Sequence, residues 1–191
     1  MATPSKSLVP TLKTRRVVTG HDAQGRSMIA SDGPCVVTQA IWHPDFSIND
    51  AWRAERLPDD NESTREPCTS PMELEPSPTG NVVRIVQFPP DRLYTKGVDV
   101  KDGFDALGST GSSAAAGYEG APHPLMHRTN SVDYIIVISG EVYAVMETGE
   151  TLLRQGDVLI QRGTNHAWSN RSDKPCMIVA ILNAAKPLTF I

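Results

Sequence analysis

The chain has 191 residues, of which 39% are hydrophobic and 21% charged, as in an ordinary globular protein and unlike a disordered chain. Its formal net charge is −4 and it has no cluster of basic residues. This charge balance argues against a nucleic-acid partner and against an anionic membrane surface.

Targeting and redox signals favour a cytoplasmic location. The N-terminal stretch MATPSKSLVPTLKTRR has no apolar core of the secretory type, and no apolar run approaches the roughly 18–20 residues of a membrane span. The three cysteines, Cys35, Cys68 and Cys176, are odd in number and widely separated. They fit a reducing compartment and predict neither a disulfide framework nor a zinc finger.

The first part of the chain predicts an N-terminal arm over residues 1–80. The segments RRVVTG and RSMIAS flank HDAQG, which has the Asp and Gly of a β-hairpin connection, and CVVTQAIW predicts a third strand. Residues 45–80 are charged and rich in proline, which predicts mostly loop, with a possible short helix around NDAWRAER.

Residues 81–191 predict a barrel. NVVRIVQFPPD resumes strand character, and the small-residue stretch DALGSTGSSAAAGYEGAPHP predicts a long loop, either a lid over a pocket or a disordered segment. Short strand-like runs then follow at regular spacing, separated by Gly, Asn or Pro: SVDYIIVISG, EVYAVMETG, ETLLRQG, DVLIQRG, TNHAWSN and PCMIVAILN. This spacing is typical of an all-β sandwich or barrel.

The segment HRTNSVDYIIVISGE contains a candidate metal site. Residues two apart share one face of a strand, so His127, Thr129, Ser131 and Asp133 would project together, followed on the same face by the apolar Ile135. A histidine and a carboxylate beside apolar residues predict a polar site inside a barrel.

A second motif follows about thirty residues later, in GDVLIQRGTNHAWSN, where His166 precedes Trp168 and Asn170. Together the two segments resemble the cupin superfamily, whose motifs read G-x5-H-x-H-x3,4-E-x6-G and G-x5-P-x-G-x2-H-x3-N. His127 matches the first histidine, Asp133 the acid, and Gly163-x2-His166-x3-Asn170 matches without a gap. The resemblance covers roughly residues 80–185 and implies a double-stranded β-helix, the jelly-roll barrel, with the N-terminal β-strands as an extension.

The sequence departs from the cupin motifs at several positions. Thr129 replaces the second histidine, and Asp133 is shorter than glutamate. Gln161 replaces the proline, and the gap between Gly156 and Gln161 is one residue shorter than in the motif. These changes reduce the ligand set that the resemblance implies.

The resemblance implies one divalent metal ion, here Zn, Fe, Mn or Ni, held by His127, Asp133 and His166. Two imidazoles and one carboxylate are also the composition of facial-triad iron(II) sites and leave open positions for water and substrate. Thr129 would then hydrogen-bond a metal-bound water or orient a ligand. In the alternative interpretation, Asp133 caps a turn or pairs with Arg128 or Arg162, and the two histidines are hydrogen-bonded pocket residues.

Further candidates follow from position. His123 and Arg128 are candidate catalytic residues beside Thr129, although His123 fits an ordinary loop residue too. Candidate substrate-binding residues are Trp168, Tyr143 and Arg162; a tryptophan beside His166 would give an apolar wall for a planar substrate, with core packing as the alternative. Each arginine has surface solvation as its alternative.

The resemblance implies a small-molecule enzyme, a metal-assisted lyase that decarboxylates or dehydrates a carbonyl- or carboxylate-bearing metabolite, polyketide or aromatic. The alternatives are an iron(II) dioxygenase and a non-catalytic binding cupin, for which Thr129 is the supporting feature. Because small cupins commonly dimerise through N-terminal strands or packed sheets, we expect a homodimer.

Overall fold

The computed structural model describes residues 8–69, 71–97, 99–109 and 120–189. Its elements are almost all strands, as the sequence predicts. They are β1 (Arg15–His21), β2 (Ser27–Pro34), β3 (Val37–Ala40), β4 (Ser47–Ala54), β5 (Asn81–Phe88), the 3-10 helix η1 (Asp91–Leu93), α1 (Val100–Asp105), β6 (Ser131–Ser139), β7 (Glu141–Met146), β8 (Gly149–Arg154), β9 (Val158–Arg162), β10 (His166–Ser169) and β11 (Cys176–Ala184).

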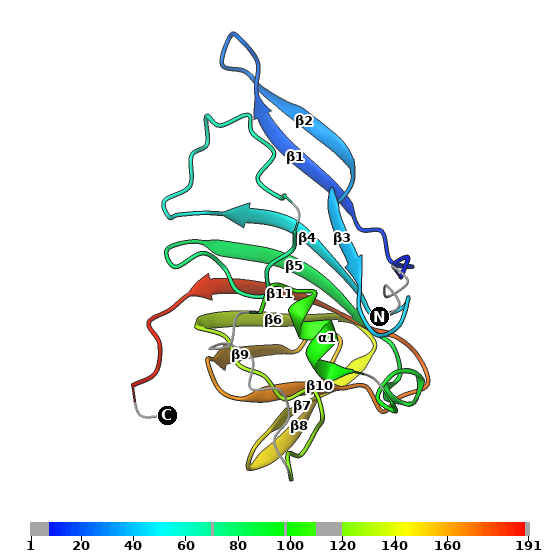
Figure 1. The fold of residues 1–191 in the computed structure, drawn as a ribbon. Coiled ribbons are helices and arrows are strands. Elements are labelled where there is room, and N and C mark those ends of the chain that lie inside the picture. Colours follow the sequence, from blue (N-terminus) through cyan, green and yellow to red (C-terminus); the bar gives the residue numbers. More distant parts are fainter. Residues whose placement is uncertain (1–7, 70, 98, 110–119, 190–191) are drawn as a thin grey trace, which may run out of the picture.

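Two antiparallel sheets enclose the core. The larger has six strands in the order β3-β4-β5-β11-β6-β9, and the smaller has three in the order β10-β7-β8. In Figure 1 the small sheet lies along the β6–β9 side of the large one. The hydrophobic core draws on both sheets, with Ile135 and Ile178 from the large sheet and Val142 and Leu153 from the small one. This arrangement is the predicted all-β jelly roll.

Alternation along β6 explains how one strand serves both the core and the surface. Ser131, Asp133 and Ile135 are buried, whereas Tyr134 and Ile138 are exposed. Period-2 burial of this kind is what a strand with one face toward a core requires. Within β6, the face predicted to be shared by Ser131 and Asp133 is therefore present.

The N-terminal residues enter the barrel more deeply than the sequence suggests. The predicted hairpin is present as β1–β2, a separate two-stranded sheet that projects from the body (Figure 1). By contrast, β3 and β4 continue the six-stranded sheet through β5, so the proposed boundary at residue 80 falls within one sheet.

The possible helix around NDAWRAER is wrong, because all but the last two residues of this segment belong to β4. Strand pairing on both sides, with β3 and with β5, overrides the local helix propensity. The helix α1 was not among the elements expected from the sequence; it begins where the Asp99 side chain accepts a hydrogen bond from the Asp102 amide at 3.1 Å. Most of the predicted lid, residues 110–119, lies outside the described residues. Within the described ranges, no helix is long and apolar enough to span a membrane.

Candidate functional site

Two histidines meet at the junction of the two sheets. His127 and His166 form an isolated antiparallel bridge in which each amide donates to the other's carbonyl at 2.8 Å. Directly opposed residues of an antiparallel pair project to the same side, and here the two ring centroids are 4.4 Å apart. Backbone pairing thus brings together two residues that are far apart in the sequence.

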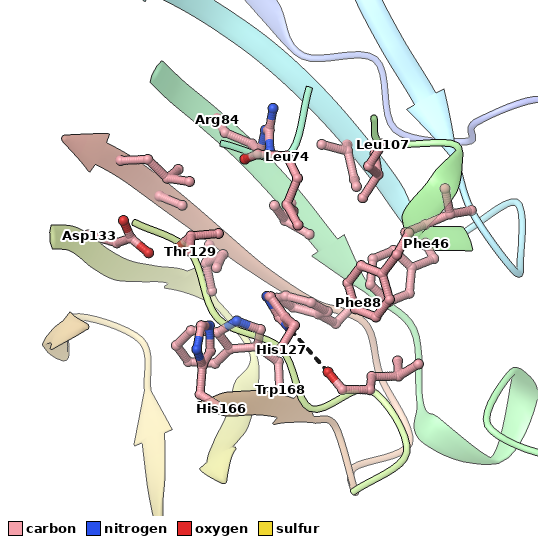
Figure 2. A pocket seen from close by; sticks show the side chains of 18 of the residues that line it. Phe46, Leu74, Arg84, Phe88, Leu107, His127, Thr129, Asp133, His166 and Trp168 are labelled. Atoms are coloured by element: carbon pink, nitrogen blue, oxygen red, sulfur yellow. Dashed lines mark hydrogen bonds between the residues drawn. The ribbon is translucent and has the colours of Figure 1, made fainter. Parts of the chain in front are cut away.

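Backbone carbonyls orient both rings. Nδ1 of His127 lies 3.0 Å from the Leu125 carbonyl, drawn as a dashed line in Figure 2, and Nδ1 of His166 lies 2.9 Å from the Thr164 carbonyl. Because a carbonyl can only accept, each Nδ1 carries the proton, and in the neutral ring Nε2 keeps a free lone pair. This is the pattern by which outer-shell groups orient metal-binding or proton-accepting histidines.

Burial keeps the two rings neutral. Desolvation lowers the pKa of His127, and desolvation followed by the neighbouring His127 lowers the pKa of His166 to about 3. Two uncharged imidazoles with free Nε2 atoms are therefore available at neutral pH.

The histidines line a cavity of about 100 Å³ between the sheets. Its wall is largely apolar and contains five aromatic side chains: Trp42, Phe46, Phe88, Phe104 and Trp168. Its polar residues are Arg84, His127, Thr129, Asp133 and His166 (Figure 2). An apolar cavity with a few convergent polar groups is the usual form of a small-molecule site.

Asp133 lies in the same cavity but apart from the histidines, with Thr129 placed between them in Figure 2. The residue is 4% exposed and its Oδ1 has no hydrogen-bond partner. Desolvation raises its pKa to about 6, against smaller lowering effects of Ser131 and Arg84. Thr129 shares a 2.7 Å hydrogen bond with the Ser131 hydroxyl.

The histidine pair fits a divalent metal in part. Its two Nε2 atoms are neutral, oriented donors, which is the ligand chemistry that such ions require. Among the described residues, however, no group of three His, Cys, Asp or Glu side chains is placed to hold a metal ion. Asp133 does not join the histidines as the predicted third ligand, so water or substrate would have to complete the coordination.

Three predicted residues lie away from the cavity. Tyr143 packs beside Met126 and Val145, and Arg171 lies 4.1 Å above its ring, so it is not part of the substrate pocket. Arg128 and Arg162 are absent from the cavity wall and line two other depressions instead.

His123 is buried but faces a different cluster. Its Nδ1 accepts a hydrogen bond from the Leu125 amide at 3.2 Å, and its Nε2 lies 3.9 Å from Asp91. Asp91 also accepts from the Ser169 hydroxyl at 2.6 Å. His123 therefore anchors the loop before β6, and the cavity contains no part of it.

Sequence reasoning missed Arg84. It lies in β5 on the inward face with Val82 and Val86, an arginine in a strand position otherwise used for core residues. An arginine two residues from a valine on each side, in a strand whose alternate positions are apolar, is the sequence signal that predicts such a residue. Asp50 on the neighbouring β4 accepts from Arg84 Nε at 2.6 Å and from Nη2 at 3.0 Å.

A jelly roll with an internal histidine pair defines a barrel of the cupin type, and the comparisons agree. The Cupin_2 family model, described as "Cupin domain", matches residues 114–182. The chain is 31% identical to Phomopsin biosynthesis cluster protein D of Diaporthe leptostromiformis, over 98% of this chain and 88% of the relative.

It is also 31% identical to the cupin-domain-containing oxidoreductase fogC of Aspergillus ruber, over 81% of this chain and 63% of the relative. Among solved structures, it is similar to the Cupin_2 domain of an XRE-family transcriptional regulator from Enterobacter cloacae, with a TM-score of 0.34, 15% identity, and coverage of 56% of this chain and 83% of that one. The chain belongs to the cupin superfamily.

Proposed function

We propose that this protein is a small-molecule enzyme of secondary metabolism that eliminates water or carbon dioxide from an apolar, carbonyl-bearing metabolite. The observation that carries the proposal is the pair of neutral, oriented imidazoles, His127 and His166, at the wall of an aromatic-lined cavity. Relatives named for biosynthesis clusters support the metabolic setting.

The histidines would hold a divalent metal through their Nε2 atoms. Such an ion would act as a Lewis acid that polarises the substrate carbonyl and increases the acidity of the adjacent C–H bond. Trp168, which is 8% exposed, and Phe104 would hold the apolar body of the substrate against this end of the cavity and exclude water.

Asp133 is suited to move the proton. A carboxyl group whose pKa is raised to about 6 is mostly ionised at neutral pH, so it can take a proton, and its pKa is close enough to that pH for it to return the proton. In a dehydration, the carboxylate would take the proton α to the carbonyl while the C=C bond forms, and the leaving hydroxyl would depart as water after receiving that proton. This role replaces His123, which lies outside the cavity.

The test uses the aldol adduct of benzaldehyde and acetone, a β-hydroxy ketone with one aromatic ring. We expect its dehydration to benzylideneacetone, followed by near-ultraviolet absorbance, and exchange of its α-hydrogens in deuterium oxide. His166→Ala should abolish both, and His21→Ala, on the exposed end of β1, should change neither. Binding of the adduct without dehydration or exchange would instead support a non-catalytic cupin, for which Thr129 is the supporting feature.

An oxygen-dependent reaction is the second candidate. Relatives over part of the chain are named cupin-domain-containing oxidoreductases, and two histidines suit iron(II). Oxygen consumption by the iron-loaded protein during turnover would favour this alternative over elimination.

We also propose a homodimer formed through the β1–β2 hairpin. A two-stranded hairpin has little stability by itself in water, and this one exposes Val17, Met28 and Ile29. Pairing with the hairpin or sheet of a second copy would bury these side chains.

A further inference from the structure

The end of the cavity away from the histidines contains a second polar site. Asp133 and Arg84 project into it from β6 and β5, with β11 between them. The register places Leu182 opposite Asp133 and Ala180 opposite Arg84. Two strand spacings across the sheet, about 10 Å, and two residues along the strands, about 7 Å, therefore separate the backbone positions of the two polar residues, and the small side chain of Ala180 fills little of the space between them.

Arg84 is not a partner for Asp133. The residue is 4% exposed, and its guanidinium is held by Asp50 on one side and by the carbonyls of Leu74, at 3.1 Å, and Glu73, at 2.7 Å, on the other. The charge of Arg84 is thus already balanced by a buried carboxylate, and its position is fixed. Asp133 keeps a buried oxygen, Oδ1, without a hydrogen-bond donor.

A buried acceptor without a donor is costly, and native structures seldom leave one unused. Thr129 does not supply the donor to Oδ1, since its hydroxyl is paired with that of Ser131. Among the described residues nothing donates to Oδ1, so this oxygen is free to accept a hydrogen bond from a molecule that fills the cavity.

We infer that Asp133 is a substrate-recognition residue whose Oδ1 accepts a hydrogen bond from a hydroxyl group on an otherwise apolar, ring-containing substrate. A hydroxyl brings one donor for one unpartnered acceptor. An ammonium would bring three donors into a mostly apolar cavity, with two left unpaired, and would lose its hydration. This inference rests on the proposed function of the cavity and names the class of metabolite it takes.

In the family motif, the acidic residue at the position of Asp133 is a metal ligand. Here Asp133 stands apart from the histidine pair, and the described residues gather no three-residue ligand group. A shortened acid and the threonine at position 129 together leave the carboxyl group for the substrate.

The test compares para-cresol with para-xylene, which has the same shape but a methyl group in place of the hydroxyl. Xylene is the more hydrophobic probe, so an apolar cavity without a polar contact would bind it more tightly. We expect the native protein to prefer cresol by roughly 10-fold or more in Kd, measured by calorimetry, as expected for a site built to bond a hydroxyl. Equal binding, or a preference for xylene, overturns the inference without any variant.

Substitutions locate the contact. Asp133→Asn keeps a carbonyl acceptor and should keep the preference for cresol, whereas Asp133→Leu should reverse it. The metal content of both variants is measured in parallel. If Asp133→Leu loses metal but still prefers cresol, Asp133 is a metal ligand and the inference is wrong. Binding and turnover are separate measurements, so a cresol preference in a protein that does not dehydrate the aldol adduct would support this inference while contradicting the proposed function.

Discussion

Gly103 of α1 lies directly beneath the indole ring of Trp42. A Cβ atom at position 103 would lie 2.1 Å from Cε2 of that ring, well inside any real contact. Trp42 is itself a non-glycine residue with a positive φ, 59°, and its Nε1 donates to the Asp99 carbonyl at 2.9 Å. Trp42, an aromatic side chain of the cavity wall, thus holds both Asp99, which caps α1, and Gly103 within the helix.

Gly103→Ala should therefore displace α1 from Trp42. We expect a loss of about 1–3 kcal/mol in the free energy of unfolding, as overpacking usually costs, and weaker binding of para-cresol because Phe104 and Leu107 line the cavity from this segment. Urea denaturation measures the first effect. Gly149→Ala is the matched control, since a Cβ there meets nothing within 4 Å. Equal losses in both variants would contradict the packing argument.

Metal retention tests the histidine pair. His127→Ala and His166→Ala each remove one of two Nε2 donors, and a ligand loss should weaken metal binding by at least about 10-fold, the lower range for losing an outer-shell partner. Elemental analysis after exhaustive dialysis should find metal in the native protein and in His21→Ala, and little in either cavity variant. Full occupancy in both cavity variants would exclude these residues as the metal site.

A third variant tests the departure from the family motif. Thr129→His restores an imidazole at the position where cupins carry one, beside His127 and on the same face. We expect tighter metal retention than in the native protein, with a loss of no more than about 1–3 kcal/mol in the free energy of unfolding, because a larger side chain is placed at a buried position. Weaker retention would indicate that position 129 does not face the histidines closely enough to coordinate.

Most of the fold followed from strand periodicity, but the site followed only in part. The alternation of His127, Thr129 and Asp133 was sufficient to place them on one face, because a strand has a fixed period of two. The separation of Asp133 from the histidine pair was not predictable, since it depends on how β6 pairs with β9 and β11 and on how β10 pairs with β7 in the other sheet. Arg84 and Phe104 come from segments brought to the cavity by long-range pairing and packing, which local patterns do not encode.

The β1–β2 hairpin is the proposed dimer interface. If the hairpin forms the dimer interface, the double substitution Val17→Lys and Ile29→Lys should convert a dimer to a monomer in light scattering coupled to size exclusion, and cresol binding should be unchanged. The control, Tyr134→Lys with Ile160→Lys, alters a cross-strand pair exposed on the outer face of β6 and β9. Dissociation by the control alone would move the interface to that sheet face.

The ionisation of Asp133 should make stability depend on pH in a direction opposite to that of a salt-bridged carboxylate. Its pKa is about 6 when folded against an ordinary 3.8, so between these values the folded state binds more protons than the unfolded state. Stability contributed by the neutral carboxyl is present below pH 3.8 and is lost as the pH rises through 6. One pKa unit corresponds to 1.36 kcal/mol, so between pH 3.8 and 6 the free energy of unfolding of the native protein should fall by about 3 kcal/mol relative to that of Asp133→Asn.

The difference between native and Asp133→Asn isolates this group. His166, whose pKa is lowered to about 3, acts in the opposite direction, because it destabilises the fold as the pH drops below its ordinary value of 6.5, but it is present in both proteins and cancels. Urea midpoints are compared at several pH values from 4 to 7 with a chelator present, so that no metal competes for the carboxylate. Parallel curves for the two proteins would mean that Asp133 is already solvated or paired, and would remove the physical basis for its role in proton transfer.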